Sequence, residues 1–379
     1  MTEPALSYLK WSMFEEMDTM KARKLLDARP LGFSQIRLLP KVNGIRPIMN
    51  LRRRVTKLQK GKVVLGRSIN SVMAPVFNML SYERRKQPSQ IGSAIFSVGE
   101  MYPKLASFRR QLKLKRPGVE SLYFAKCDVQ SCFDTIPQRR LVKLVEQVAS
   151  EHEYRIARHA EIKSSDNHAY GLGATMKPSR KFFASARPYT DFAHFNEVVG
   201  KDHAKGKKNT VFVDAVVQTS QKRDTMLDLL EEHVERNIVK IGKKFFKQKA
   251  GIPQGSVLSS LLCNFFYAEL ERETLGFLNE DESILLRLID DFLLITTNKE
   301  HAERFLQIMH NGIEKYGVKV NQAKSLVSFE TTVNGGQISR LAGSTAFPYC
   351  GNMIDIRTLE ITKDRDRRQD SSMKLFSNS

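Results

Sequence analysis

The chain has 379 residues, of which 41% are hydrophobic and 27% charged. This length and composition suit a protein with two or three folded lobes and argue against a largely disordered chain. No stretch approaches the roughly 20 apolar residues of a membrane span, and the N-terminus lacks the basic start and apolar run of a secretory signal. The four cysteines form no CxxC pair, which indicates a reducing compartment and no zinc site.

Positive charge is concentrated in the first third of the chain. The formal net charge is +20, and residues 1–127 contain 25 basic and 8 acidic side chains, against 36 and 33 in residues 128–379. A clustered basic surface favours a polyanionic partner, because contacts to phosphates release counterions. Nucleic acid is the favoured partner on charge alone. An anionic membrane surface and a solvated basic face without a specific role are the alternatives.

A β-hairpin is predicted near the start of the chain. Two short apolar runs flank Asn43-Gly44, a dipeptide typical of two-residue hairpin turns. The hairpin would place Lys41 and Arg46 near its tip on opposite strands. Both side chains are therefore candidates for phosphate contacts.

The middle of the chain contains a predicted strand and helix, followed by a more polar region. Residues 122–127 are predicted to form a strand that enters Asp128, and Pro137 is expected to open an amphipathic helix. Residues 150–250 are polar, rich in His and Lys, and contain only short apolar segments plus one helical stretch. We interpret this region as an inserted subdomain.

In the last third, a turn at residues 251–256 precedes a helix with one apolar face. Two apolar runs, 284–289 and 292–295, then flank Asp290-Asp291. A further amphipathic helix over residues 302–313 and several strand-like segments complete the predicted elements.

Asp290 and Asp291 are candidate metal ligands. An Asp in a hairpin ordinarily serves the turn alone, but apolar flanks must pack on both sides of this pair. Two carboxylates about 4 Å apart repel by roughly 4 kcal/mol at an effective dielectric of 20, and Mg²⁺ bound to their oxygens removes that cost. With Asp128 at the end of its own strand, the set could hold two metal ions about 3.5–4 Å apart. In-line phosphoryl transfer needs such positioning and charge neutralisation.

The order of these segments resembles the motifs of reverse transcriptases. Residues 37–48, 128–137, 251–256 and 288–292 carry the matching motifs. Several details are similar to telomerase reverse transcriptases: Leu-Ile before the Asp pair, a long gap before Gly251, and no prolines in the helix that follows the turn. Residues 349–360 look like the primer-grip region of that family. The resemblance runs from about residue 10 to residue 361.

The resemblance implies roles for individual residues. The ligands of two Mg²⁺ ions would be Asp128, Val129, Asp290 and Asp291. Phe133 would lie under the sugar and exclude a ribonucleotide 2′-OH, although a core aromatic is the plain alternative. Lys324 would protonate pyrophosphate, with a surface lysine as the alternative. The remaining implied contacts are Lys41 and Arg46 with the triphosphate, Gln254 and Gly255 with the template–nucleotide pair, and Tyr349 (in place of the more usual Trp), Cys350 and Gly351 with the primer 3′ end.

The implied fold is α+β, that of a right-hand polymerase whose palm is built on an antiparallel sheet. The expected parts are basic fingers (1–120), a first palm segment (121–149), a helical insertion in the fingers (150–249) and a second palm segment with the primer grip (250–379). The thumb and the RNA-binding region of that family would be missing. We therefore expect a fragment, an incomplete gene model or a truncated product.

The implied activity is RNA-templated DNA synthesis that extends a DNA 3′ end from dNTPs. The implied partners are a telomerase RNA template and a telomeric DNA primer, with no membrane, in the nucleus at telomeres. Two alternatives stay open. One is a reverse transcriptase of retroelement or group II intron type; the other is a nucleic-acid-binding module that keeps the fold without turnover.

Overall fold

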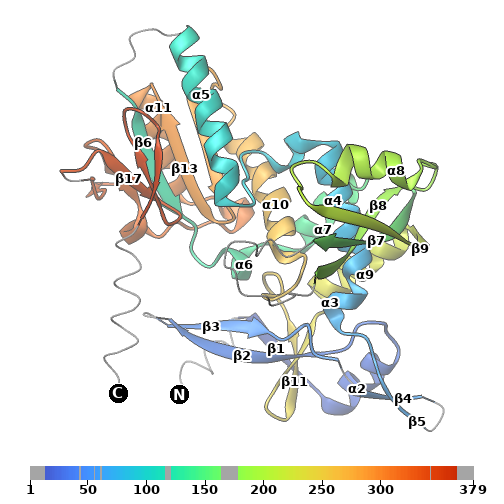
Figure 1. The fold of residues 1–379 in the computed structure, drawn as a ribbon. Coiled ribbons are helices and arrows are strands. Elements are labelled where there is room, and N and C mark those ends of the chain that lie inside the picture. The colour runs from blue at the N-terminus through green and yellow to red at the C-terminus, as the bar shows by residue number, and fades with distance from the viewer. Residues whose placement is uncertain are drawn as a thin grey trace, which may run out of the picture. The chain divides into compact units, whose positions relative to one another are not determined.

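The computed structural model of the protein consists of two compact units (Figure 1). It describes residues 13–41, 44–54, 56–59, 62–115, 121–163, 178–341 and 343–364. The first unit contains residues 1–88, 138–249 and 253–261, and the second contains residues 89–137, 250–252 and 262–379. Among the described helices, none combines the length and apolar character that a membrane span requires.

The described part of the first unit contains two larger sheets and a separate two-stranded hairpin, β4–β5. A five-stranded sheet has the order β1-β11-β10-β2-β3 and is antiparallel except where β10 pairs with β2, and a three-stranded antiparallel sheet has the order β8-β7-β9. Its strands are β1 (Phe14–Met17), β2 (Ser34–Lys41), β3 (Gly44–Met49), β4 (Thr56–Gln59), β5 (Lys62–Leu65), β7 (Glu153–Lys163), β8 (Ser179–Pro188), β9 (Thr210–Lys222), β10 (Ile238–Ile241) and β11 (Lys244–Gln248). Its helices include α2 (Thr19–Asp27), α3 (Ile69–Val72), α4 (Ala74–Lys86), α7 (Gln138–Val148), α8 (Phe195–Val198) and α9 (Arg223–Glu235).

The predicted N-terminal hairpin is present as β2 and β3, which pair antiparallel. Lys41 pairs with Gly44, and Leu39 pairs with Arg46, so the two basic residues lie on opposite strands as predicted. Gly44 of the Asn-Gly signal is the first residue of β3, and residues 42–43 lie between the two strands. Those two residues lie outside the described part of the chain.

The expectation of a helical insertion was wrong for most of residues 150–249. Strands β7, β8 and β9 span 11, 10 and 13 residues and form the larger part of this region. Buried Tyr154 and Ile156 occupy alternate positions of β7, the period of a strand, before the register shifts between Ala157 and His159. The polar and basic residues between them hid that alternation, and the helical segments described in this region are α8, the π-helix Val199–His203 and α9.

The second unit contains a four-stranded antiparallel sheet of order β12-β13-β6-β14. Helix α5 buries Met101, Leu105 and Phe108 in one apolar core with residues of β6, β12, β13 and β17. The elements of this unit include α5 (Met101–Lys115), β6 (Tyr123–Asp128), α6 (Cys132–Thr135), most of α10 (Ser259–Thr274), β12 (Ser283–Leu288), β13 (Asp291–Thr296), α11 (Lys299–Asn311), β14 (Leu326–Val327), β15 (Thr332–Val333), β16 (Gly336–Gln337), β17 (Ala346–Tyr349), β18 (Asn352–Asp355) and β19 (Ile361–Lys363). Helices and mainly antiparallel sheets confirm the α+β class.

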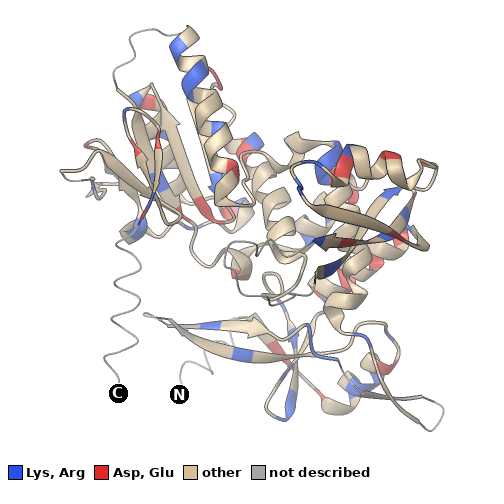
Figure 2. Ribbon diagram, viewed as in Figure 1, with Lys and Arg blue, Asp and Glu red and all other residues tan. Residues whose placement is uncertain are grey.

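The contacts divide the chain differently from the expected fingers and palm boundaries. Residues 89–115 belong to the second unit, because the apolar face of α5 packs into its core. The basic residues of α5, coloured blue on the ribbon in Figure 2, therefore belong to the unit that contains Asp128, Asp290 and Asp291. Conversely, α7 belongs to the first unit.

Candidate active site

Three aspartates meet at one end of the four-stranded sheet of the second unit. Asp128 is the last residue of β6, and Asp291 is the first residue of β13. The antiparallel register pairs these two residues directly, and Asp290 precedes Asp291 in the turn from β12. One carboxylate oxygen of each residue lies within 4.8 Å of those of the other two. The structure thus brings together the three residues that were predicted to share a metal site.

The turn that carries Asp290 has a strained backbone. Ile289 and Asp290 alone connect β12 to β13, and Ile289 has a φ of +61°. A β-branched residue rarely adopts this left-handed conformation. The carbonyl of Asp290 accepts a hydrogen bond of 3.1 Å from the backbone N–H of Val129. The turn is therefore tied to the end of β6, and Val129, another predicted metal ligand, is buried beside it.

Burial and neighbouring negative charge raise the proton affinity of Asp290 and Asp291. Burial, followed by the charge of Asp128, raises the pKa of Asp290 above its ordinary value. Burial together with the charges of Asp128 and Asp290 raises the pKa of Asp291 to about 6. Half-buried like charges that remain ionised at pH 7 repel one another, and a divalent cation offsets that repulsion. Three carboxylates form a hard, all-oxygen donor set that fits Mg²⁺.

Lys324 contacts the triad directly. Its Nζ donates a hydrogen bond of 2.8 Å to Oδ2 of Asp128, and this bond raises the pKa of the lysine. The side chain of Lys324 is 61% exposed, whereas that of Asp128 is 14% exposed. The lysine therefore meets the acidic cluster from the solvent side, where a bound phosphate could compete for it.

The predicted primer-grip residues lie beside Asp291. The hydroxyl of Tyr349 donates a hydrogen bond of 2.9 Å to the carbonyl of Asp291 and accepts one of 3.2 Å from the N–H of Leu288. Cys350 places its Sγ 3.8 Å from Oδ2 of Asp291. Cys350 and Gly351 both have positive φ and form the tight turn from β17 to β18. Tyr349 is fully buried, so it supports β13 from within the unit.

Phe133 is held through its backbone. Its carbonyl accepts a hydrogen bond of 2.7 Å from the N–H of Ile252. Gly251 has a φ of +68°, and a Cβ at that position would lie 2.3 Å from the carbonyl oxygen of Phe133. Only glycine fits this close approach. The backbone of Gly251 therefore packs directly against the carbonyl group of Phe133.

The predicted nucleotide-binding residues of the first unit gather at the β2–β3 hairpin. The carbonyl of Gln254 accepts a hydrogen bond of 2.8 Å from the N–H of Met49, at the end of β3. Gly255 has a φ of +106°, and a Cβ there would lie 2.4 Å from the carbonyl oxygen of Met49. Arg46 is exposed on the same strand, and the side chain of Lys41 lies outside the described part of the chain.

Sequence reasoning missed two groups that adjoin the triad. Cys132 hydrogen-bonds Cys263 and Asp290. The hydrogen bond with Cys263, followed by burial, raises the pKa of the Cys132 thiol. Arg287, two residues before the β12–β13 turn, is fully buried and forms an ion pair with Glu271. A charged residue between Leu286 and Leu288 in an otherwise apolar strand was the available signal for this pair.

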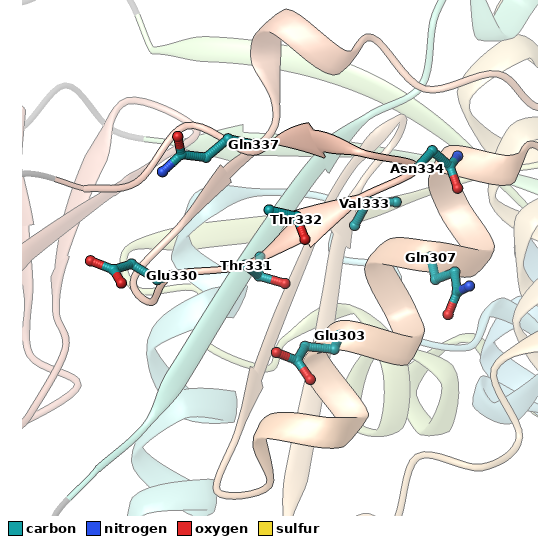
Figure 3. A pocket seen from close by; sticks show the side chains of 8 residues that line it. All are labelled: Glu303, Gln307, Glu330, Thr331, Thr332, Val333, Asn334 and Gln337. Carbon is teal, nitrogen blue, oxygen red and sulfur yellow. The ribbon is translucent and has the colours of Figure 1, made fainter.

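A cavity of about 630 Å³ lies apart from these residues, between α11 and the β15–β16 hairpin (Figure 3). Glu303, Gln307, Glu330 and Asn334 are among its lining residues. None of the predicted site residues contributes to it. The triad, an open set of oxygens at a sheet end, remains the candidate for chemistry.

Comparison with known proteins relates the chain to reverse transcriptases. A family model described as "Reverse transcriptase (RNA-dependent DNA polymerase)" matches residues 207–354. Telomerase reverse transcriptase of Rattus norvegicus is 30% identical over 349 residues, which cover 90% of this chain and 30% of the rat protein. That of Canis lupus familiaris is 30% identical over 358 residues, with coverages of 92% and 31%. The chain spans about a third of the length of these relatives.

Solved structures of telomerases share the fold. Apo telomerase from Candida tropicalis superposes with a TM-score of 0.62 at 19% identity, over 95% of this chain and 51% of that one. Telomerase from Candida albicans in complex with a TWJ fragment of telomeric RNA gives 0.63 at 18% identity, over 96% and 50%. The predicted resemblance to telomerase reverse transcriptases is confirmed. Reverse transcriptases imply the use of a divalent metal, and the aspartate triad fits that requirement.

Proposed function

Because this chain is a relative of telomerase reverse transcriptases over about 90% of its length, we propose that it catalyses RNA-templated addition of dNTPs to a DNA 3′ end. The observation that carries this proposal is the convergence of Asp128, Asp290 and Asp291 at one sheet end. The product would be telomere repeats. The proposed partners are a telomeric RNA template and a DNA primer, and the proposed location is the nucleus, at telomeres.

The aspartates would hold two Mg²⁺ ions, with Val129 as a further ligand. When bound, these ions lower the pKa of the primer 3′-OH and neutralise charge on the triphosphate. The residues of this chain supply the rest of the arrangement. Tyr349, through the carbonyl of Asp291, supports the strand that presents the carboxylates, and the adjacent turn of Cys350 and Gly351 would position the primer end.

Four further roles follow for the residues around the incoming nucleotide. Lys324 would leave Asp128 to donate a proton to pyrophosphate, as a general acid. Phe133 would exclude the 2′-OH of a ribonucleotide. Lys41 and Arg46 would hold the triphosphate, while the absence of a side chain at Gly255, together with Gln254, would allow close approach to the template–nucleotide pair.

We further propose that the first unit provides the fingers and their insertion and that the second provides the palm. In this assignment the insertion is the β8-β7-β9 sheet with α8, and the primer grip is β17–β18. The supporting observations are the triad in the second unit and the basic β2–β3 hairpin in the first.

The proposal is tested by nucleotide incorporation on a supplied RNA template and DNA primer over a Mg²⁺ titration. We expect metal-dependent extension by the full chain and none by Asp128→Asn. The matched control is Asp281→Asn, an exposed aspartate of the same unit, which should extend normally. Salt-sensitive duplex binding without extension at any Mg²⁺ concentration would instead indicate a binding module that does not turn over.

A further inference from the structure

A buried arginine lies near the end of β12, two residues before the Ile289-Asp290 turn. Arg287 has no exposed surface. Its Nε donates to Oε1 of Glu271 at 2.5 Å, and its Nη1 donates to Oδ1 of Asn264 at 2.8 Å. Its Nη2 donates to the carbonyls of Ile91 and Asn264, each at 3.2 Å. Every nitrogen of the guanidinium group therefore has a partner.

The partners of Arg287 are themselves held in place. Glu271 accepts hydrogen bonds from the N–H of Ser93 at 2.8 Å and from its hydroxyl at 2.7 Å. Gly92 has a φ of +56°, and a Cβ there would lie 2.2 Å from Oε2 of Glu271. Backbone hydrogen bonds join Arg287 to Ser93 and Ile95. The network thus ties β12 to α10 and to residues 91–95.

One contact of this network reaches the active-site turn. Nη1 of Arg287 also lies 3.4 Å from the carbonyl oxygen of Ile289, the residue with the strained left-handed backbone. The next residue along the chain is Asp290. A strained turn persists only where its surroundings hold it, and here the surroundings include a rigid, fully engaged guanidinium group.

We propose that Arg287 is a positioning residue for the metal site. Together with Glu271 and Asn264 it holds the carbonyl of Ile289, and so keeps the carboxylate of Asp290 in register with those of Asp128 and Asp291. This inference rests on the proposed function, in that the triad binds divalent cations. A buried ion pair is weak support for stability by itself, since apolar residues of similar size often replace such pairs without loss. The proposed role is therefore geometric.

The test measures Mn²⁺ binding to the full chain by electron paramagnetic resonance, without nucleotide or turnover. Arg287→Lys keeps the charge but loses the planar fork, and we expect its Mn²⁺ affinity to fall about tenfold or more, as for other groups that orient metal ligands. Leu112→Ala is the matched control, because it removes buried side-chain volume in the same unit far along α5 from the turn. It should lower the melting temperature and leave Mn²⁺ affinity unchanged.

A second variant separates positioning from general loss of stability. Ile289→Gly removes the backbone strain, so the effect of Arg287→Lys on Mn²⁺ affinity should shrink in that background. If Arg287→Lys does not fold, Glu271→Gln replaces it, with a smaller loss expected in the same direction. Unchanged Mn²⁺ affinity in these folded variants would overturn the inference alone. Equal Mn²⁺ binding by the unsubstituted chain and by Asp128→Asn would overturn the proposed function instead.

Discussion

Asp128 and Asp291 face each other across β6 and β13, and each is the terminal residue of its strand. The pairing brings together two carboxylates that are 163 positions apart in the sequence. A slip of one residue in this register would turn Asp291 to the opposite face of the sheet. The apolar side chains of β13, all buried, oppose such a slip because they would lose their places in the core.

The like charges of the triad should destabilise the metal-free protein. We expect Asp291→Asn to raise the free energy of unfolding by about 1 kcal/mol at pH 7 in EDTA, because it removes one repelling charge. The same variant should lose nucleotide incorporation. Urea unfolding followed by circular dichroism measures the first effect. Glu280→Gln, an exposed carboxylate of the same unit, should change neither quantity, and a less stable Asp291→Asn would contradict the expectation.

Lys324 should act through its proton and not through its charge alone. We expect Lys324→Ala to slow single-turnover incorporation about 10²-fold or more, as for loss of a general acid. Lys324→Arg keeps an ion pair with Asp128 but is a far weaker acid, so it should be nearly as slow. Lys319→Ala, an exposed lysine nearby in the chain, is the control. Full activity of Lys324→Arg would show that charge suffices.

Phe133 is expected to set sugar selectivity. Phe133→Ala should raise incorporation of rNTPs relative to dNTPs, because the 2′-OH would no longer meet the ring. The measurement is the ratio of kcat/KM for matched rNTP and dNTP substrates. Phe277→Ala, which removes a ring that packs against Arg304, should leave the ratio unchanged. An unchanged ratio in Phe133→Ala would refute the sugar-gate role.

Gly255 is expected to be irreplaceable for steric reasons. In Gly255→Ala the new Cβ would lie 2.4 Å from the carbonyl oxygen of Met49, so the backbone must move. We expect a loss of about 3 kcal/mol or more in unfolding free energy. Gly242→Ala is the matched control, since Gly242 also has a positive φ of +62° but no atom within 4 Å of the added Cβ. It should cost only about 1 kcal/mol. Equal losses of unfolding free energy in the two variants would mean that backbone strain, and not contact with Met49, causes the destabilisation.

A buried histidine should make the first unit sensitive to acid. Burial, with a smaller effect of Arg29, lowers the pKa of His233 to about 4, and its Nε2 lies 2.8 Å from Oγ of Ser256. A histidine whose pKa is lowered by folding contributes full stability above its unfolded pKa of about 6.5 and loses it as the pH falls toward 4. The loss should approach about 3 kcal/mol.

The measurement is the free energy of unfolding at several values between pH 7 and pH 4.5. His233→Gln keeps a polar partner for Ser256 and does not titrate, so its stability should fall less steeply than that of the unsubstituted chain. Parallel curves would show that His233 does not govern the acid response.

Helices and hairpins whose signals lie in adjacent residues of the chain could be predicted from the sequence. The β2–β3 hairpin, α7 after Pro137 and the β12–β13 hairpin all lie where the local pattern placed them. The β8-β7-β9 sheet was missed because polar and basic residues interrupt the apolar residues of β7 and because its strands pair across long intervals without a short hairpin turn. The place of α5 in the second unit could not be predicted, because helix periodicity does not tell which core a helix joins.

Residue chemistry and order along the chain determined the family resemblance, the fold class and the identity of the three aspartates as candidates. The tertiary structure alone decided which groups act on them: Lys324 on Asp128, Tyr349 on the carbonyl of Asp291, and Arg287 on the carbonyl of Ile289. The physical reason is that residue type and local periodicity are encoded by neighbours in the sequence. Hydrogen bonds between distant segments depend instead on strand register and core packing, which exist only once the chain has folded.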